Sequence, residues 1–358
     1  MRIRSLKLSH FRNLPALALQ VPAGAGLVGL VGANGSGKTS VLEAISLLTP
    51  TRGLLGAEGR AQVRHGAKEW GLWAQLSDET EIGAVYRKGS RQLQINAQPA
   101  QQADLTRHGS VIWLTPATDF LFGGPPAARR RWLDDLVTSL IPHHANAVSR
   151  FRQHRQARLR LLAQGQGGDW LDAEERLAAE WGVQVLIHRR EYLQQLAPYL
   201  NNLTLELHGA AVEVLDQPDP VATLKGKFER SRDIDARLQR THAGPNTADL
   251  AGQLQVEEGR QVAMAHASSG QHKRGLVMAL LAHVRLMQKA TGKPPLVLID
   301  EFSAHLDATR RRALTADLLA LGCQVWFSDT EAPATGEAIH IITLSQAEEE
   351  ARPLKKSA

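Results

Sequence analysis

The chain has 358 residues, of which 43% are apolar and 22% are charged, and these proportions favour a folded globular protein over a disordered one. No stretch approaches the roughly 18 uncharged apolar residues of a membrane-spanning helix, and the N-terminus lacks a secretory pattern. We therefore expect a cytoplasmic protein with no membrane partner. The single cysteine, Cys323, excludes an internal disulfide and a multi-cysteine metal site. The net charge of +6 suits a polyanionic partner without requiring one.

The first third of the chain has the apolar pattern of β-strands. Alternating or continuous apolar residues predict strands near 3–8, 17–21, 27–31, 72–76, 82–86 and 93–95. We therefore expect a sheet-rich lobe that extends to about residue 110.

The middle of the chain has a helical pattern. A long proline-free stretch at 142–198 is interrupted only by the glycine cluster at 165–168, which predicts a helical hairpin. Strands at 203–207 and 211–215 and a charged helix near 221–240 are expected to follow. The remainder alternates between sheet-like and helical segments, predicted at 254–264, 271–290, 296–300, 307–321 and 323–327.

A phosphate-binding motif follows the third predicted strand. The residues match G-x-x-x-x-G-K-[ST] between an apolar strand and a helical pattern, which is the context that this motif requires. Its glycines allow backbone N–H groups to turn toward phosphate oxygens, while the lysine reaches the β- and γ-phosphates and the threonine hydroxyl binds Mg²⁺. The sequence therefore predicts an ATP and Mg²⁺ site at Gly32, Ala33, Asn34, Gly35, Ser36, Gly37, Lys38, Thr39 and Ser40.

A second motif has the form of a Walker B strand. The apolar run at 296–299 ends in Asp300 and Glu301, at the position where α/β proteins place ligand sites. Asp300 is predicted to hold Mg²⁺ through water, and Glu301 to polarise the water that attacks the γ-phosphate. Alone, such a strand end could be a solvated boundary, but its pairing with the phosphate-binding loop favours the catalytic interpretation.

The third motif assigns the class of nucleotide-binding protein. Ser268, Ser269, Gly270 and Gln271 open a helical pattern and resemble the signature of ABC ATPases. In that superfamily the signature contacts the γ-phosphate of ATP held by the other subunit. A simple helix cap is the alternative interpretation. The segment 303–307, with the sequence Ser-Ala-His-Leu-Asp, resembles the D-loop of the same superfamily and favours the signature.

The chain also resembles the RecF family over nearly its whole length. The opening Leu-Lys-Leu-Ser-His-Phe-Arg-Asn at 6–13 is similar to RecF and its SMC-like relatives, and the insertion between the first and third motifs has the moderate size of RecF. This resemblance implies an α/β fold with an ABC-type P-loop ATPase head and an inserted, mainly helical lobe. We predict that lobe I comprises residues 1–115 and 250–358, and that lobe II comprises residues 116–249.

The resemblance further implies an ATP-dependent homodimer that functions in DNA recombination, repair and replication. It implies binding to duplex DNA or single-strand/duplex junctions, slow ATP hydrolysis, and cooperation with RecR and RecO so that RecA loads at gaps. Two alternatives remain, namely the ATPase subunit of a transporter and a DNA clamp with little hydrolysis. A nuclease is disfavoured, because no second carboxylate cluster accompanies Asp300 and Glu301.

A basic segment is the candidate for DNA contact. The cations Arg150, Arg152, Arg155 and Arg158 lie in a predicted helix without a nearby acid and could neutralise backbone phosphates. A solvated helix face is the alternative. Four tryptophans with apolar neighbours are predicted to lie in the core rather than to stack on bases: Trp113, Trp132, Trp170 and Trp181.

Overall fold

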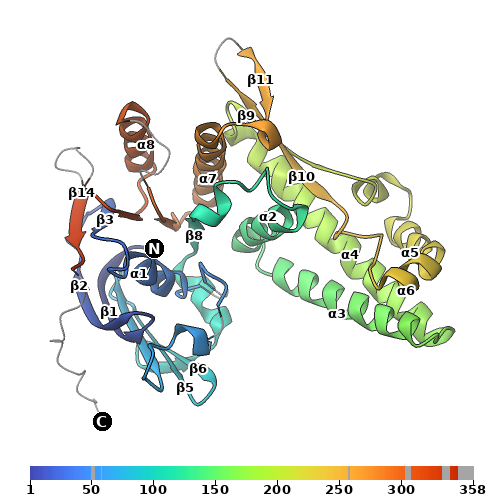
Figure 1. Ribbon diagram of the computed structural model, residues 1–358, viewed down its shortest axis with the longest axis horizontal. Helices are drawn as coiled ribbons and strands as arrows, with labels where there is room; N and C mark the ends of the chain where they lie inside the picture. Colours follow the sequence, from blue (N-terminus) through green and yellow to red (C-terminus); the bar gives the residue numbers. More distant parts are fainter. Residues whose placement is uncertain (50–52, 58, 257–258, 303–307, 333–338, 346–358) are drawn as a thin grey trace. The chain divides into compact units, whose positions relative to one another are not determined.

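The computed structural model describes the chain except for residues 50–52, 58, 257–258, 303–307, 333–338 and 346–358. Its contacts divide the chain into two compact units (Figure 1). Unit 1 comprises Met1–Asp119 and Met287–Ala358, and unit 2 comprises Phe120–Leu286. Among the helices of the described part, none is both long and apolar enough to cross a bilayer.

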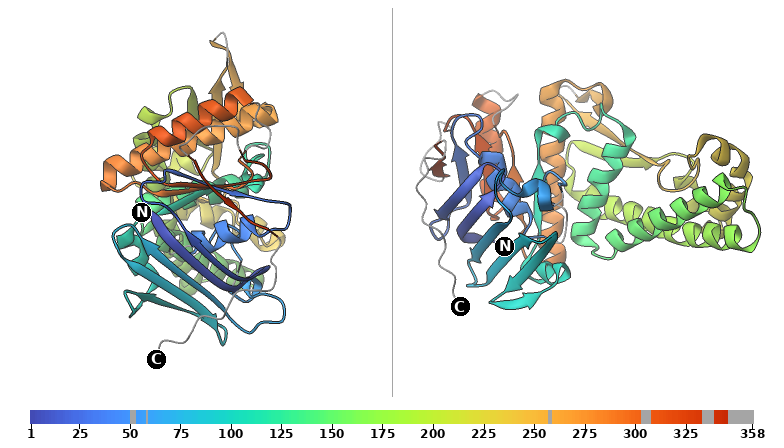
Figure 2. Two further views of the ribbon diagram at one scale, coloured as in Figure 1. Left: turned by 90° about the vertical axis from the view of Figure 1, so that its left-hand side faces the viewer. Right: turned by 60° about the horizontal axis from the view of Figure 1, so that its bottom comes forward.

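Unit 1 contains a six-stranded antiparallel sheet in the order β2-β1-β4-β5-β6-β7, drawn in blue and cyan (Figure 2). Along β4 the buried and half-buried residues alternate, which is the pattern of a strand with one face on the core. The predicted strands of this region are confirmed, and β7 is an additional short one. Their bounds are β1 Ile3–Phe11, β2 Leu14–Gln20, β4 Trp70–Leu76, β5 Glu81–Arg87, β6 Ser90–Ile95 and β7 Gln98–Ala100.

A parallel sheet in the order β14-β3-β13-β12-β8 forms the second layer of unit 1. Its three central strands are buried along their whole length, as expected for parallel strands covered on both faces. The strands are β3 Leu27–Val31, β8 Val111–Leu114, β12 Leu296–Ile299, β13 Val325–Asp329 and β14 Ile339–Thr343.

Helix α1 (Lys38–Ser46) packs in the core that the two sheets share. Its apolar face, which includes Val41, Leu42 and Ile45, is buried among residues of both sheets. Because this packing fixes the helix, the loop that precedes it is held at the carboxyl end of β3. Helix α8 (Ala308–Ala320) also belongs to unit 1.

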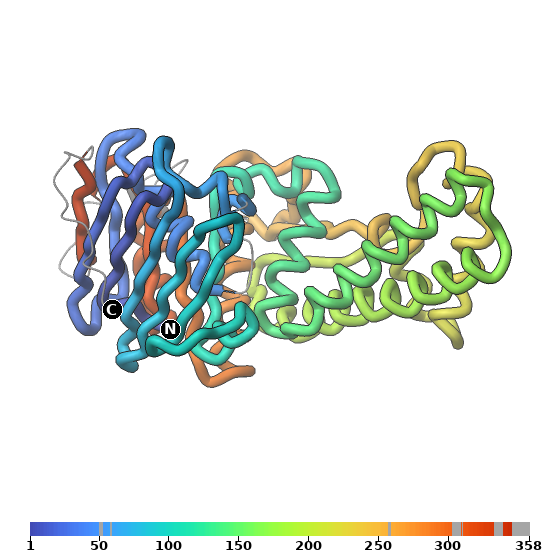
Figure 3. The backbone as a smooth tube through the Cα atoms, turned by 90° about the horizontal axis from the view of Figure 1, so that it is seen from below, coloured from blue at the N-terminus to red at the C-terminus, as the bar shows by residue number. Residues whose placement is uncertain are grey.

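Unit 2 is mainly helical. The predicted hairpin is confirmed as α3 (His144–Ala163) and α4 (Asp169–Leu196), which lie side by side along most of α3, in green (Figure 3). Gly165 and Gly168 adopt positive φ angles in the turn between them, at 65° and 79°. The remaining helices are α2 Pro126–Leu140, α5 Pro220–Arg230, α6 Arg232–Leu238 and α7 Ser269–Thr291, the last of which ends in unit 1.

A three-stranded antiparallel sheet in the order β11-β10-β9 completes unit 2. Its strands are β9 (Leu203–His208), β10 (Asp249–Gln255) and β11 (Gln261–Ala263). Because β10 pairs with β9 along six residue pairs, residues 250–286 group with unit 2, whereas the sequence places them in lobe I.

The strand predicted at 211–215 is wrong. Val212–Asp216 forms a 3₁₀ helix that packs on α4 and buries Val214 and Leu215. A short apolar run does not by itself distinguish a strand from a buried helical turn, which explains the error.

A chain of polar side chains connects three helices of unit 2, including α7, which begins within the signature. The Tyr192 hydroxyl on α4 lies 2.8 Å from Nδ1 of His283 on α7, and Nε2 of His283 lies 2.9 Å from the Ser139 hydroxyl on α2. Burial lowers the pKa of His283 to about 3, so the imidazole is neutral at physiological pH. Since Ser139 donates to the Leu136 carbonyl, we assign donation from Nε2 to Ser139 and from Tyr192 to Nδ1.

A buried ion cluster joins α3, α4 and α6. The Arg158 side chain is 0% exposed and donates to Glu175 at 2.9 Å and to Asp235 at 2.6 Å, and both carboxylates are also 0% exposed. Its remaining donors reach the Phe228 carbonyl and the Ser231 hydroxyl. The guanidinium is therefore satisfied by groups inside the fold.

We predict that Arg158→Met destabilises the protein by about 3–5 kcal/mol, because it leaves Glu175 and Asp235 buried with less compensating charge. Denaturant unfolding measures this loss. Arg152→Met on the same helix serves as the control, since Arg152 is exposed, and it should change stability by less than about 0.5 kcal/mol. Equal effects of the two substitutions would contradict a central role for the ion cluster.

Candidate functional site

The phosphate-binding motif forms the loop between β3 and α1. Gly37 precedes the helix with a φ of 97°, and α1 has neither a side-chain cap nor an acidic residue in its first turn. Position 32 requires glycine because the backbone of Leu344 lies close to it, and a Cβ there would lie 2.3 Å from the Leu344 carbonyl oxygen. The loop therefore presents an uncapped helix N-terminus, which is a general anion site.

Two further side chains make this loop suitable for phosphate. The Lys38 ammonium donates to the carbonyls of Gly32 and Ala33, at 2.6 and 2.9 Å, so it lies directly over the loop. The Ser36 hydroxyl is buried and has no hydrogen-bond partner among the described residues. A phosphate oxygen would satisfy both the hydroxyl and the first amides of α1.

The Walker B carboxylate contacts the phosphate-binding loop. The Thr39 hydroxyl lies 3.1 Å from both carboxylate oxygens of Asp300, at the carboxyl end of β12. Ser328, near the end of β13, donates to Asp300 at 2.5 Å and accepts the backbone N–H of Glu301 at 2.9 Å. Glu301 has a φ of 54°, in the left-handed region. A hydroxyl and a carboxylate in contact form an oxygen donor set that suits Mg²⁺.

A pocket of about 640 Å³ brings most of the predicted residues of unit 1 together. Four residues of the pocket were not predicted from the sequence, namely Asn13, Ser328, Asp329 and Thr330. Ser328 could have been identified as a small polar residue at the end of an apolar strand. For Asn13, the sequence offers no signal beyond its place in the RecF-like opening. The pocket is lined by Asn13, Asn34, Gly35, Gly37, Lys38, Thr39, Ser40, Asp300, Glu301, Ser328, Asp329 and Thr330.

The signature residues lie in unit 2, where they form a capping box at the start of α7. The Ser268 N–H donates to the Gln271 side chain at 2.9 Å, and the Gln271 N–H donates to the Ser268 hydroxyl at 3.4 Å. Ser268 is exposed, while Ser269 and Gly270 are half-buried. This geometry is that of a helix cap. It also leaves the N-terminus of α7 accessible and lined by small residues, as an anion-binding signature needs. The predicted D-loop at 303–307 lies outside the described residues.

The basic segment on α3 divides into exposed and buried members. Arg150 and Arg152 are exposed and form no ion pair with a described residue, and Arg155 is half-buried. The prediction that Arg158 contacts DNA is wrong, because its guanidinium is buried against Glu175 and Asp235. The prediction that Trp170 lies in the core is also wrong, because Trp170 is 79% exposed.

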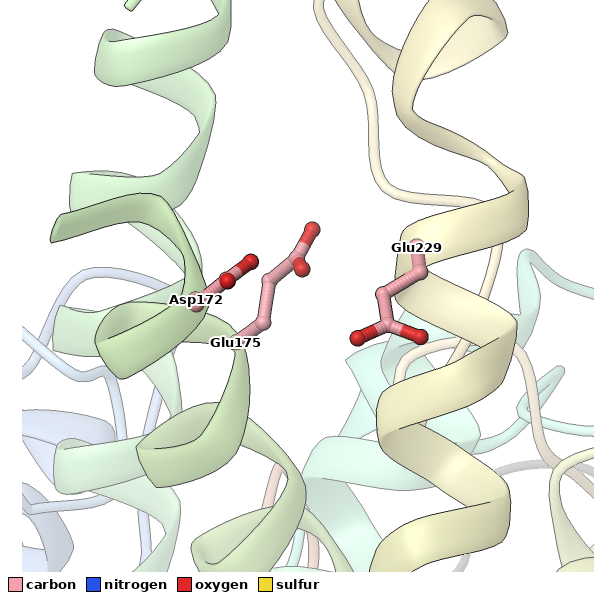
Figure 4. Close-up of side chains that lie close together, drawn as sticks. All are labelled: Asp172, Glu175 and Glu229. Atoms are coloured by element: carbon pink, nitrogen blue, oxygen red, sulfur yellow. The ribbon is translucent and has the colours of Figure 1, made fainter. Parts of the chain in front are cut away.

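An acidic group occurs elsewhere in unit 2. Asp172 and Glu175 on α4 face Glu229 on α5, and their carboxylate oxygens lie within 4.8 Å of one another (Figure 4). Arg232 pairs with the first two and Lys225 with the third. Every carboxylate of the group therefore has a cationic partner, and Glu175 also pairs with Arg158, so the group is explained as an ion-pair network.

Comparisons of the sequence with known proteins identify relatives over nearly the whole chain. A family model described as the RecF/RecN/SMC N terminal domain matches residues 2–351. A DNA replication and repair protein RecF from Mesorhizobium japonicum is 36% identical over 353 residues, which cover 92% of each chain. A protein of the same name from Rhizobium etli strain CIAT 652 is 37% identical over 349 residues, covering 91% of each.

Comparison with solved structures gives the same fold. The recombination mediator protein RecF-ATPrS in the RecFOR pathway matches with a TM-score of 0.81 and 20% identity over 96% of each chain. The Smc head domain from Pyrococcus furiosus, bound to the C-terminal domain of ScpA, matches with a TM-score of 0.50 and 15% identity, covering 92% of this chain and 90% of that one. These similarities confirm the predicted α/β fold of an ABC-type ATPase head.

We predict that Lys38→Ala abolishes nucleotide binding, because it removes the only side-chain ammonium among the residues that line the pocket. Titration with a fluorescent ATP analogue measures the affinity, and sedimentation tests for an ATP-dependent dimer. Lys88→Ala, at an exposed turn of the same unit, is the control and should bind like the unaltered protein. An ATP-dependent dimer in Lys38→Ala would contradict the assignment of the loop.

Proposed function

Because this chain belongs to the RecF family of DNA replication and repair proteins, we propose that it dimerises around ATP and acts on DNA as a slow ATPase. The observation that carries the proposal is the contact of Thr39 with Asp300 beside an uncapped helix N-terminus. The buried Ser36 hydroxyl has no hydrogen-bond partner among the described residues, and a phosphate oxygen at the same place would supply one.

Within one subunit, each side chain of the pocket has a distinct role in this proposal. Lys38 moves from the loop carbonyls to the β- and γ-phosphates, and the first amides of α1 bind phosphate oxygens. Thr39 and Asp300 hold Mg²⁺, which neutralises phosphate charge when it is bound. Glu301, turned by its left-handed backbone, orients the attacking water, and Ser328 keeps Asp300 and Glu301 in place through its two hydrogen bonds.

The signature supplies the second half of each ATP site from the partner subunit. Ser268 is exposed, and among the described residues its hydroxyl makes only the long, 3.4 Å contact to the Gln271 N–H, so it can turn to a γ-phosphate at little cost. With Ser269, Gly270 and Gln271 it opens α7, whose first amides attract an anion. Two chains related by a two-fold axis would then form two identical sites, and ATP would be shared between them.

The finer functions also belong to this proposal. Arg150 and Arg152, with Arg155 beside them, would contact backbone phosphates of duplex DNA or of single-strand/duplex junctions. RecR and RecO are the proposed partners, through which RecA would load at gaps. One similar solved structure is that of a recombination mediator protein in the RecFOR pathway, which supports this proposal.

We expect Glu301→Gln to retain ATP-dependent dimerisation and to lower the hydrolysis rate at least about 100-fold, since a general base is removed while its shape is kept. Single-turnover hydrolysis and sedimentation measure the two properties, and Glu69→Gln, an exposed carboxylate in the same unit, is the control. If both proteins hydrolyse ATP at the same measurable rate, Glu301 does not have this role. If neither protein hydrolyses ATP detectably, a clamp with little hydrolysis is favoured.

We expect Arg150→Ala combined with Arg152→Ala to weaken DNA binding and to reduce its salt dependence, by roughly 0.9 in the slope of log K against log salt for each DNA phosphate that is no longer neutralised. Binding is measured on single-stranded, duplex and gapped DNA, with ATP, ADP or no nucleotide. Arg176→Ala with Arg237→Ala removes the same charge from exposed sites on α4 and α6. Equal slopes for both pairs would assign the α3 cations to a solvated face.

A further inference from the structure

The turn between β1 and β2 has an unusual backbone beside the nucleotide pocket. Arg12 in the turn and His10 near the end of β1 adopt φ angles of 53° and 49°, in the left-handed region that non-glycine residues rarely occupy. Such residues persist where the surrounding structure holds them in place, and they occur frequently at functional sites. The contacts of Arg12 and Asn13, which follow Phe11, indicate the role of the turn.

Arg12 ties the turn to the helix of the phosphate-binding loop. Its guanidinium donates to both carboxylate oxygens of Glu43 on α1, at 2.7 Å each, and Glu43 is 1% exposed. These hydrogen bonds raise the pKa of Arg12. A third donor reaches the Ala61 carbonyl at 2.8 Å, and the Arg12 backbone N–H reaches the Gln62 carbonyl. A bidentate pair of this kind fixes direction as well as distance.

Asn13, the next residue, uses its amide to hold the loop at two points. Its Nδ2 donates to the Gly35 carbonyl at 2.7 Å, and its Oδ1 accepts the Ser40 hydroxyl at 2.7 Å. These contacts lie on either side of Gly37, against which the turn packs closely enough that a Cβ at Gly37 would approach Leu14 to 2.5 Å. The amide therefore sets both the peptide plane after Gly35 and the first turn of α1.

We propose that Asn13 is a positioning residue of the nucleotide site, which holds the loop in its phosphate-binding conformation before ATP arrives. This inference rests on the proposed binding of ATP to that loop. A preorganised loop loses less conformational entropy when the ligand binds, so Asn13 raises nucleotide affinity without taking part in the chemical step. Arg12 and Glu43 anchor the residue to α1.

An amide is the group that this position needs, because one end must donate and the other must accept. Aspartate has nearly the same shape and still accepts the Ser40 hydroxyl, but it cannot donate to the Gly35 carbonyl. It would also place a carboxylate oxygen against that carbonyl oxygen. Asn13→Asp therefore removes one hydrogen bond and repels the loop, while it leaves the size of the side chain unchanged.

We expect Asn13→Asp to weaken binding of a fluorescent ATP analogue about tenfold, and to leave the hydrolysis rate at saturating ATP within about twofold of the unaltered protein. The matched control is Asn96→Asp, in another turn of the same sheet. Asn96 has a φ of 49°, and its Oδ1 accepts the Glu81 N–H at 2.8 Å, a bond that aspartate retains. The control should therefore bind the analogue normally.

Thermal unfolding without nucleotide separates positioning from stability, because a purely structural role would lower the midpoint and leave affinity unchanged among folded molecules. Unchanged affinity in Asn13→Asp, or a loss confined to the saturated rate, overturns the inference. If that variant unfolds, Asn13→Ala removes both hydrogen bonds of the amide without adding a charge and should also weaken binding about tenfold, and no loss overturns the inference. Failure of the unaltered protein to bind the analogue would instead refute the proposed function.

Discussion

The contact between the Thr39 hydroxyl and the Asp300 carboxylate is the constraint on which the candidate site depends. The two residues are separated by 261 positions in the chain, and they follow strands β3 and β12, which are not neighbours in the sheet. Strand β13 lies between these strands and contributes Ser328, which hydrogen-bonds to Asp300. The site therefore exists only when three parallel strands from both ends of the chain are in register.

The motifs whose predicted strand and helix context the structure confirms are those that are contiguous in the chain. The loop from Gly32 to Ser40 and the end of β12 each contain their own strand, turn and functional group, so a short window of sequence is enough to identify them. The family resemblance, and with it the fold class, was likewise supported by such windows. Ser328 and Asn13 escaped prediction because their roles arise only when segments distant in the chain meet.

The α3 segment illustrates the limit of reasoning from charge. Arg152, Arg155 and Arg158 recur along one helix without a neighbouring acid, so the sequence predicts the same environment for all three. In the fold, Arg152 is exposed while Arg158 is enclosed by carboxylates from α4 and α6. Periodicity reports which residues share a helix face, and it does not report what other segments cover that face. The exposure of Trp170 has the same explanation.

The ion cluster around Arg158 has a consequence for the order in which unit 2 folds. Arg158 and Glu175 leave the ribosome well before Asp235, because synthesis proceeds from the N-terminus. Until α5 and α6 are made, the nascent α3–α4 hairpin carries a guanidinium that lacks both the Phe228 carbonyl and one of its two carboxylates. The hairpin is therefore expected to remain loosely formed and hydrated during translation, and to close only when the segment from α5 to α6 arrives.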